Sequence, residues 1–471
     1  MLHHRSRTSP VFRLCFTILL SALSATAAAE PSFRLNALTD DIGWLTLRGE
    51  GRVRYESLEN QFRANRSGSD QLLLFRTLLH AQARADSWSL GLELQDSRTY
   101  LGDSGTPLSS SIANPLDILQ LYVKYDDAPG LLGPDSSTQL TLGRQTVSIG
   151  SKRQIERVDF ANVIKSYTGL HVVSTAARGD ELHLVYVVPT ARFPNQRPAL
   201  DDNELSGDEE QWGRHIWAVH YRRADILPAF ASDLWGEVFV YGLEEEDTSS
   251  FQTPDRSYVA PGFRLYRAPK MEQWDVDLEA SWRTGSRYAT SQRTDTENLE
   301  TDAQMVFAAL GYTFPIAWSP RFAFEYYYAS GDDDPADNRF DQHERLFGSR
   351  RSDINNTSIN GPLTPANLNA PGFRIEVKPG PRTDARFYYH AAHLASATDA
   401  WVIAGLRDTT GQSGDFIGHQ LDGRVRHWLI KDSLRLELGG SALIPGEFPK
   451  NVPGGNDEVT LFGYTQLTFS F

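Results

Sequence analysis

The sequence predicts an all-β protein whose strands form a closed antiparallel transmembrane β-barrel of about 18 strands. Three observations support this fold class. Polar and apolar residues alternate in many segments, and long and short connections alternate between those segments. The last alternating segment ends on an aromatic residue, Phe471. A sheet that closes on itself in a bilayer accounts for all three, because lipid offers no partner to an open sheet edge.

The composition excludes two other classes of protein. Hydrophobic residues make up 40% of the 471 residues, and the mean hydropathy is −0.41. A bundle of membrane helices needs repeated apolar runs of about 18 residues or more, which such a composition does not supply. Aromatic residues reach 11%, too many for a disordered chain. In a membrane barrel every second strand residue faces a polar lumen, so a low mean hydropathy is expected.

Residues 1–29 are predicted to be a secretory signal peptide, and residues 30–471 to be the outer-membrane barrel domain. A short apolar stretch, 14–23, separates a basic region from the small residues Ala27–Ala29. The alternative, a transmembrane anchor, needs about 20 apolar residues, and this stretch is shorter. The single cysteine, Cys15, lies in this segment. The exported chain is therefore expected to contain no disulfide and no thiolate metal ligand.

Strands are predicted wherever apolar and polar residues alternate with a period of two. In the first of them Leu45, Leu47 and Val53 lie on one face, and Arg48 and Arg52 lie on the other. The predicted strands are 44–58, 70–86, 88–98, 118–126, 138–146, 160–175, 181–188, 214–222, 234–243, 258–267, 273–283, 303–314, 321–330, 370–379, 383–394, 418–428, 433–443 and 459–471.

The connections between these strands indicate the type of barrel. Every second connection is long, and short turns come between the long ones. Outer-membrane barrels have this arrangement, because their periplasmic turns are short and their outer loops are long. The final strand, 459–471, ends on an aromatic residue, as the assembly signal of outer-membrane barrels does. We therefore expect the protein in the bacterial outer membrane of a Gram-negative cell, in contact with lipid.

The charge of the chain is acidic and unevenly distributed. Residues 1–29 hold three arginines and no acidic residue, so the remaining chain has 43 basic and 60 acidic residues, a net charge of −17. Such a chain is a poor nucleic-acid binder. Acidic residues gather in 201–210, 244–247, 295–302 and 332–337. We interpret these runs as solvated loops; the alternative is contact with divalent cations near a charged lipid surface.

The strand positions that face the lumen carry more basic than acidic residues, in contrast to the whole chain. The guanidinium group of arginine matches a carboxylate in a bidentate way, which favours a pore that attracts a carboxylated solute. The alternative is that arginine and glutamate pair across strands and brace the wall. The arginines at these positions that we propose to line the pore are Arg48, Arg52, Arg54, Arg76, Arg84, Arg374, Arg386, Arg424 and Arg426.

Five segments, in order, resemble motifs of the alginate-export family of outer-membrane barrels. The resemblance extends over most of the exported chain, about residues 40–471. The matching segments are Gly143-Arg144-Gln145 with Gly150, Arg153 and Asp159; Phe340-Asp341 with Phe347-Gly348; the stretch from Tyr388 to Trp401; Gly418-His419-Gln420-Leu421-Asp422; and Pro445-Gly446-Glu447-Phe448.

The resemblance implies an 18-stranded monomeric barrel whose arginine-rich lumen passes an acidic polysaccharide across the outer membrane. By position, it adds Arg144 and Arg153 to the pore-lining candidates and supports Arg386. It also implies periplasmic polysaccharide-export proteins as partners. Three features depart from the family pattern. Thr168 stands where an aspartate is expected, and Gln420 stands where a glutamate is expected. Loop 331–369 is long and acidic, which is expected to repel a polyanion at the mouth.

The sequence contains no motif for catalysis, a cofactor or a metal centre. It has no Gly-x-Ser-x-Gly, no His-Glu-x-x-His and no phosphate-binding loop. Our first hypothesis is therefore a passive channel for an anionic, uronate-like polysaccharide or oligosaccharide. A porin for small anionic nutrients is the alternative, and acidic loops that fold inward to narrow the pore would favour it. An outer-membrane enzyme or adhesin is a third hypothesis.

Overall fold

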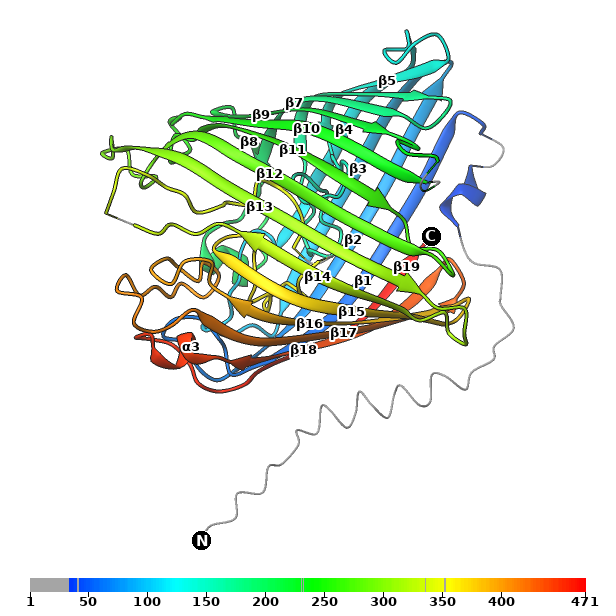
Figure 1. The fold of residues 1–471 in the computed structure, drawn as a ribbon. Helices are drawn as coiled ribbons and strands as arrows, with labels where there is room; N and C mark the ends of the chain where they lie inside the picture. Colours follow the sequence, from blue (N-terminus) through cyan, green and yellow to red (C-terminus); the bar gives the residue numbers. More distant parts are fainter. Residues whose placement is uncertain (1–33, 40–41, 230, 232, 335, 351–352) are drawn as a thin grey trace.

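The computed structural model describes residues 34–39, 42–229, 231, 233–334, 336–350 and 353–471. The predicted signal peptide lies outside these residues. The described chain forms a β-barrel, with the long loops at the left of Figure 1 and the short turns at the right. The strands run between these two ends, as expected for a wall that crosses a bilayer.

Each predicted strand corresponds to a strand of the barrel. A two-residue strand, β8 (Glu209–Glu210), pairs only with β7 and belongs to a long loop. The wall strands are β1 (Leu45–Glu59), β2 (Ser69–Ala85), β3 (Trp88–Tyr100), β4 (Asn114–Ala128), β5 (Ser136–Gln145), β6 (Tyr167–Ala176), β7 (Glu181–Ala191), β9 (Arg214–Arg223), β10 (Leu234–Glu245), β11 (Ser257–Arg267), β12 (Trp274–Tyr288), β13 (Asn298–Thr313), β14 (Arg321–Ala329), β15 (Leu368–Gly380), β16 (Thr383–His393), β17 (Phe416–Ile430), β18 (Leu434–Pro445) and β19 (Thr460–Ser470).

The first and last strands close the barrel. β1 pairs with β19 from Glu50↔Ser470 to Glu59↔Leu461, and its other edge pairs with β2. In the described part of the chain, consecutive wall strands are antiparallel neighbours, and β9 follows β7 directly. The prediction of a closed antiparallel barrel of 18 strands is confirmed.

One predicted strand begins too early. The segment 160–175 was expected to be a strand throughout, but β6 begins at Tyr167. The residues before it turn into the barrel: Val163 is fully buried and Ile164 is 1% exposed. Asn162 holds the turn, because its Nδ2 donates to the carbonyl of Ile112 at 2.8 Å. Apolar side chains here face a packed interior, so the segment is apolar without being part of the wall.

The described residues also form three short helices, although the sequence predicted only strands. They are the 3-10 helix η1 (Leu35–Leu38), α2 (Arg197–Asp201) and α3 (Glu447–Asn451). None of the described helices is both long and apolar enough to span a membrane.

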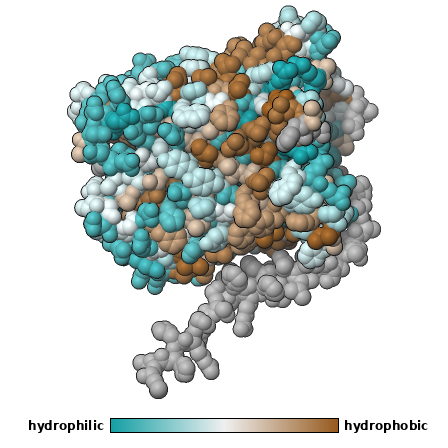
Figure 2. All heavy atoms as spheres, viewed as in Figure 1, coloured by the Kyte–Doolittle hydropathy of each residue, from teal (hydrophilic) through white to brown (hydrophobic). Residues whose placement is uncertain are grey.

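The outer wall carries the apolar residues that a bilayer requires. Figure 2 shows hydrophobic residues gathered over the wall and hydrophilic residues over the long loops at the left. At the short-turn end, Trp44, Trp88 and Trp274 expose 55–59% of their surface. Tryptophan rings prefer the boundary between lipid and water, so these residues are placed to anchor the barrel at that boundary.

Candidate functional site: the lumen constriction

Two long loops enter the lumen and meet there. We call them the constriction loops: residues 146–166, between β5 and β6, and residues 330–367, between β14 and β15. Their backbones bond to each other, since Phe347 N donates to Gln154 O at 2.9 Å and Ser349 N donates to Lys152 O at 3.0 Å. Parts of loop 330–367 are visible in yellow within the barrel in Figure 1. The lumen is therefore narrowed by folded chain.

Loop 330–367 is held against the wall by buried groups. Ile354 and Ile359 are fully buried. Asn356 N donates to the Asp422 carboxylate of β17 at 2.7 Å, and Asn360 Nδ2 donates to Ser441 Oγ of β18 at 2.8 Å. A loop with apolar residues packed inside and polar contacts to two strands is a fixed part of the barrel interior.

Arg153 ties both constriction loops to the wall. Its guanidinium lies 3.0 Å from Asp353 of the other loop, 2.9 Å from Asp277 and 2.8 Å from Glu279 of β12. The guanidinium also stacks on the Phe307 ring at 3.8 Å. Burial alone would lower the pKa of Arg153, but the three carboxylates outweigh it and raise that pKa. The group is thus a buried cation with its charge fully compensated.

Three predicted pore arginines anchor loop 146–166 from the facing wall. Arg76 Nη1 donates to Asp159 O at 2.8 Å, and Arg52 Nη2 donates to Ala161 O at 2.7 Å. Arg54 Nη1 donates to the carbonyl of the residue between these two, also at 2.8 Å. All three arginines face inward, as expected, and are at most 4% exposed. Their donors are directed at the loop backbone, so they stabilise the constriction.

Arg374 and Arg386 face inward around one tyrosine of the wall. Arg374 Nε lies 2.7 Å from Glu325 Oε1, and its guanidinium is 4.4 Å from the ring centre of Tyr388. The Arg386 guanidinium lies 4.8 Å from the same ring centre. Both residues therefore form part of the bracing of β14, β15 and β16.

The remaining wall arginines lie at the short-turn end of the lumen. Arg424 and Arg426 of β17 share the carboxylate of Asp384, at 3.1 and 3.0 Å. Arg84 of β2 is 64% exposed at its side chain and lies 3.8 Å from Asp126. Pairs of this kind fit the alternative that arginines brace the wall.

Arg144 lies on the other side of the wall, contrary to our expectation. It is paired across the strands with Leu121, which is 48% exposed, and shares its face with Leu142, which is 62% exposed. Its guanidinium lies 2.9 Å from Glu210 of β8. The alternation of β5 directs Gln145 inward and Arg144 outward, so the motif resemblance assigned the wrong face.

Five basic side chains near the constriction were missed in the sequence analysis. We call them the loop cations, and they come from four different loops: Arg63, Lys165, Arg192, Arg345 and Arg350. Each donates to a backbone carbonyl. The bonds run from Arg63 to Ile359 (2.8 Å), from Lys165 to Phe347 (2.9 Å), from Arg192 to Val163 (3.3 Å), from Arg345 to Gly348 (2.7 Å) and from Arg350 to Gly361 (3.1 Å).

The loop cations have no acidic partner in the described ranges, where no carboxylate oxygen lies within 4.0 Å of any of the five. They lower one another's pKa instead. Burial, and then the neighbouring Arg345, lowers the pKa of Lys165 well below its ordinary value. Burial, followed by Arg345 and Arg63, lowers the pKa of Arg350 to about 9. These residues thus form one positive region at the constriction, in which Glu156 is a more distant acidic neighbour of Lys165 and Arg345.

The positive region could not be read from strand alternation. Alternation gives the direction of a side chain only within a strand, and all five loop cations lie in loops. The loop predicted at 331–369 was expected to repel a polyanion at the mouth, because it is long and acidic; its acidic run is 332–337. Arg345 and Arg350 follow that run, and the fold carries them inside the lumen.

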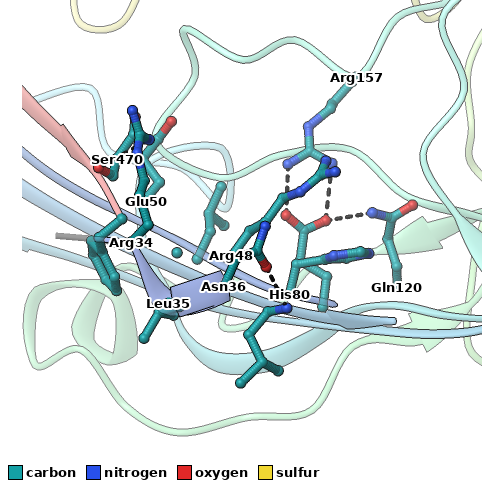
Figure 3. Close-up of a pocket in the computed structure, with 14 residues that line it drawn as sticks. Arg34, Leu35, Asn36, Arg48, Glu50, His80, Gln120, Arg157 and Ser470 are labelled. Atoms are coloured by element: carbon teal, nitrogen blue, oxygen red, sulfur yellow. Dashed lines mark hydrogen bonds and ion pairs between the residues drawn. The ribbon is translucent and has the colours of Figure 1, made fainter. Parts of the chain in front are cut away.

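A cavity of about 620 Å³ lies between the constriction and the short turns. Residues of β1, β2 and β4 line this cavity (Figure 3). Arg157 of constriction loop 146–166 and Arg34, the first described residue, line it as well. Arg157 is engaged with Glu93 of β3, at 2.9 Å. Arg48 also lines this cavity, and its side chain is exposed to it.

The described residues contain no metal centre, since no group of three or more His, Cys, Asp or Glu in those ranges is arranged to hold an ion.

Comparison with known proteins agrees with this geometry. A family model for alginate export matches residues 43–460. A search of curated protein sequences found no match. Among solved structures, OccK2 of Pseudomonas aeruginosa has a TM-score of 0.56 at 12% identity, over 90% of this chain and 97% of that one.

Two further structures have the same fold. A BenF-like porin from Pseudomonas fluorescens Pf-5 has a TM-score of 0.58 at 11% identity, over 91% of this chain and 98% of that one. OccAB2 of Acinetobacter baumannii has a TM-score of 0.59 at 11% identity, over 94% and 99%. The chain belongs to the alginate-export family and is a β-barrel channel of the bacterial outer membrane.

Proposed function

We propose that the protein is a passive channel for small carboxylated solutes of the uronate class. The observation that carries this proposal is the set of loop cations, which face the constriction without a carboxylate partner in the described ranges. A half-buried cation with no carboxylate in contact raises the local potential and favours an entering anion. Solute carboxylates would take the place that Asp and Glu fill around Arg153.

The size of the solute is inferred from the constriction loops. They cross the lumen, bond to each other and are fixed by Arg153 and by Asn356. A polymer would need this packed chain to move aside, whereas a single sugar acid needs only a gap between side chains. A narrowed lumen lined by fixed charges therefore favours small anions over long chains.

One structural neighbour supports the choice of probe. OccK2 of Pseudomonas aeruginosa was also solved in complex with glucuronate, and that structure has a TM-score of 0.52 at 13% identity, over 90% of this chain and 95% of that one. Glucuronate carries one carboxylate on a hydroxylated ring. It is therefore the probe that we would use first.

The test is ion selectivity in a planar bilayer, together with block by glucuronate. We expect an anion-selective current for the wild type. In R345Q/R350Q the selectivity should fall, and the glucuronate concentration for half-block should rise about tenfold, the equivalent of one charge-assisted hydrogen bond. The matched control is R66Q/R293Q, which removes two exposed loop arginines at the same end of the barrel. A cation-selective wild type, or equal effects in both double variants, would overturn the proposal.

A second candidate is the passage of acidic polysaccharide, in either direction. Membership of the alginate-export family favours it. This candidate requires the constriction loops to leave the lumen. If uronate polymers of many residues cross the wild-type channel at a rate similar to monomers, this second function replaces the first. Assistance by periplasmic polysaccharide-export proteins, and action as a monomer, remain proposals that belong with it.

A further inference from the structure

We infer that Arg48 is the centre of a second carboxylate site, on the short-turn side of the constriction. The ligand class is a small monocarboxylate with a hydroxylated ring. This inference rests on the proposed function, because it concerns the path of the same solute, but the residues and the side of the channel are different from those of the loop cations.

The site is built on one transverse row of the barrel wall. Arg48 of β1 is paired across the strands with His80 of β2, His80 with Glu93 of β3, and Glu93 with Gln120 of β4. All four line the cavity of about 620 Å³. Arg48, His80 and Gln120 are labelled in Figure 3. The volume of the cavity falls in the range of about 300–1,000 Å³ that is typical of small-molecule sites.

Glu93, the acidic residue of the row, already has hydrogen-bond partners for its carboxylate. Arg157 donates to both oxygens of Glu93, at 2.9 and 3.0 Å, and Gln120 Nε2 also donates to it. Gln120 Oε1 in turn accepts from Thr146 N at 2.9 Å. The second acid of the cavity, Glu50, forms an ion pair with Arg76 at 2.5 Å. Neither acid is therefore left to neutralise Arg48.

Arg48 is the open cation of this cavity. Across the described ranges, no hydrogen bond or ion pair to a protein group is found for its guanidinium, and its side chain is exposed to the lumen. Its neighbour His80 has one weak contact, between Nε2 and the Tyr122 hydroxyl at 3.5 Å. A guanidinium binds a carboxylate in a bidentate way, and the imidazole of His80 can bond to ring hydroxyls.

The number of open cations determines the ligand class. The other arginine at the mouth, Arg34, donates to backbone carbonyls, among them Ser470 O at 3.5 Å. Arg157 is engaged by Glu93. One open guanidinium matches one carboxylate, so a monocarboxylate fits better than a dicarboxylate. Because Arg157 belongs to a constriction loop, a solute at Arg48 sits directly after the constriction on its way through.

The experiment is block of the oriented channel by glucuronate added to one side at a time. A cysteine introduced at exposed Ser249 reports orientation through a membrane-impermeant thiol reagent, because the exported chain is predicted to have no other cysteine. We expect glucuronate on the short-turn side to block the wild type, and glucose to have no effect. In R48Q the half-blocking concentration on that side should rise about tenfold, and on the loop side it should change little.

Two further variants make the result decisive. R223Q removes an exposed charge at the same end of the barrel, from a side chain on the outer face of β9, and should leave the block unchanged. R48K keeps the charge without the bidentate fork, and should show an intermediate block. If R48Q and R223Q behave alike while R345Q/R350Q loses selectivity, the Arg48 site is wrong and the proposed function stands. If glucuronate blocks the wild type from neither side, both fail.

Discussion

At the scale of single residues, the lumen contains two kinds of arginine. Arg153 and Arg374 lie within 3.0 Å of carboxylates, whereas Arg345 and Arg350 bond only to carbonyls among the described residues. A paired guanidinium attracts a passing anion weakly, because its field is cancelled nearby. The two kinds should therefore respond differently to substitution. Replacing an arginine paired with a carboxylate should affect the stability of the barrel, and replacing an arginine bonded only to carbonyls should affect the ion selectivity of the channel.

The first prediction concerns Arg153. In R153Q, Glu279 and Asp353 would lose the guanidinium that lies 2.8 and 3.0 Å from them, while Asp277 would keep Arg264 at 2.6 Å. Breaking a buried pair in this way costs about 3–5 kcal/mol. We expect the constriction loops to detach, with larger and noisier single-channel currents. D353N in the same chain removes one of the stranded charges and should restore part of the quiet current. Currents that are as quiet in R153Q as in the wild type would contradict the assigned role.

The second prediction concerns pH and two groups of loop 330–367. Burial, and then Arg283, lowers the pKa of His343 to about 3, so the packed loop loses stability as the pH falls below about 6.5. Burial, and then Asp399, raises the pKa of Asp332 to about 6, so the packed loop loses stability as the pH rises from about 4 through 6. The two effects have opposite signs between pH 7 and pH 5.

Single substitutions should separate these two effects. Relative to the wild type, acidification from pH 7 to pH 5 should loosen the loop in D332N and tighten it in H343N. The stability of the packed loop should change by about 1–2 kcal/mol in each case. The change can be measured as the fraction of time that the channel spends in noisy open states. Shifts of the same sign in both variants would show that other groups control the loop.

At the scale of elements, the seam between β1 and β19 is where the barrel closes. β19 ends at Ser470, opposite Glu50, and Phe471 exchanges two backbone hydrogen bonds with Gly49. Beyond this pair, Asn36 Oδ1 accepts from Leu47 N at 2.9 Å. The N-terminal segment thus protects the exposed edge at the short-turn end.

The third prediction compares two glycines on the same face of β1. A Cβ added at Gly49 would lie 2.2 Å from the Phe471 ring, whereas a Cβ at Gly51 would meet nothing within 4 Å. G49A should therefore destabilise the barrel by about 1–3 kcal/mol, the usual cost of overpacking. G51A should be near neutral. The check is the urea midpoint of barrel unfolding, and equal midpoints for the two variants would contradict the seam geometry.

The elements show how far sequence reasoning reaches. Strand alternation identified every wall strand and the closing strand, because the pattern reports which face meets lipid. Alternation failed at 160–166, where apolar residues turn into the lumen. The error at Arg144 has another origin, because its face was assigned from a motif and not from the alternation of β5. Alternation also missed the loop cations, since the path of a loop depends on contacts with distant strands, such as that of Asn356 with Asp422.

At the scale of the whole molecule, charge is sorted by position. Residues 30–471 carry a net charge of −17, yet none of the five loop cations at the constriction has a carboxylate within 4.0 Å in the described ranges. On the proposed function, a positive narrow point favours anions at the step where the path is tightest. This arrangement requires the loops to stay in the lumen, so the selectivity and the size limit of the channel have the same structural origin.

The most direct test of this account is solute entry into vesicles that contain the wild-type protein. The vesicles would be offered glucuronate, glucose and a long uronate polymer in separate measurements. The account predicts that glucuronate enters faster than glucose, because the two have similar size and differ in charge, and that the polymer is excluded. Equal entry of glucuronate and glucose, or passage of the polymer, would contradict it.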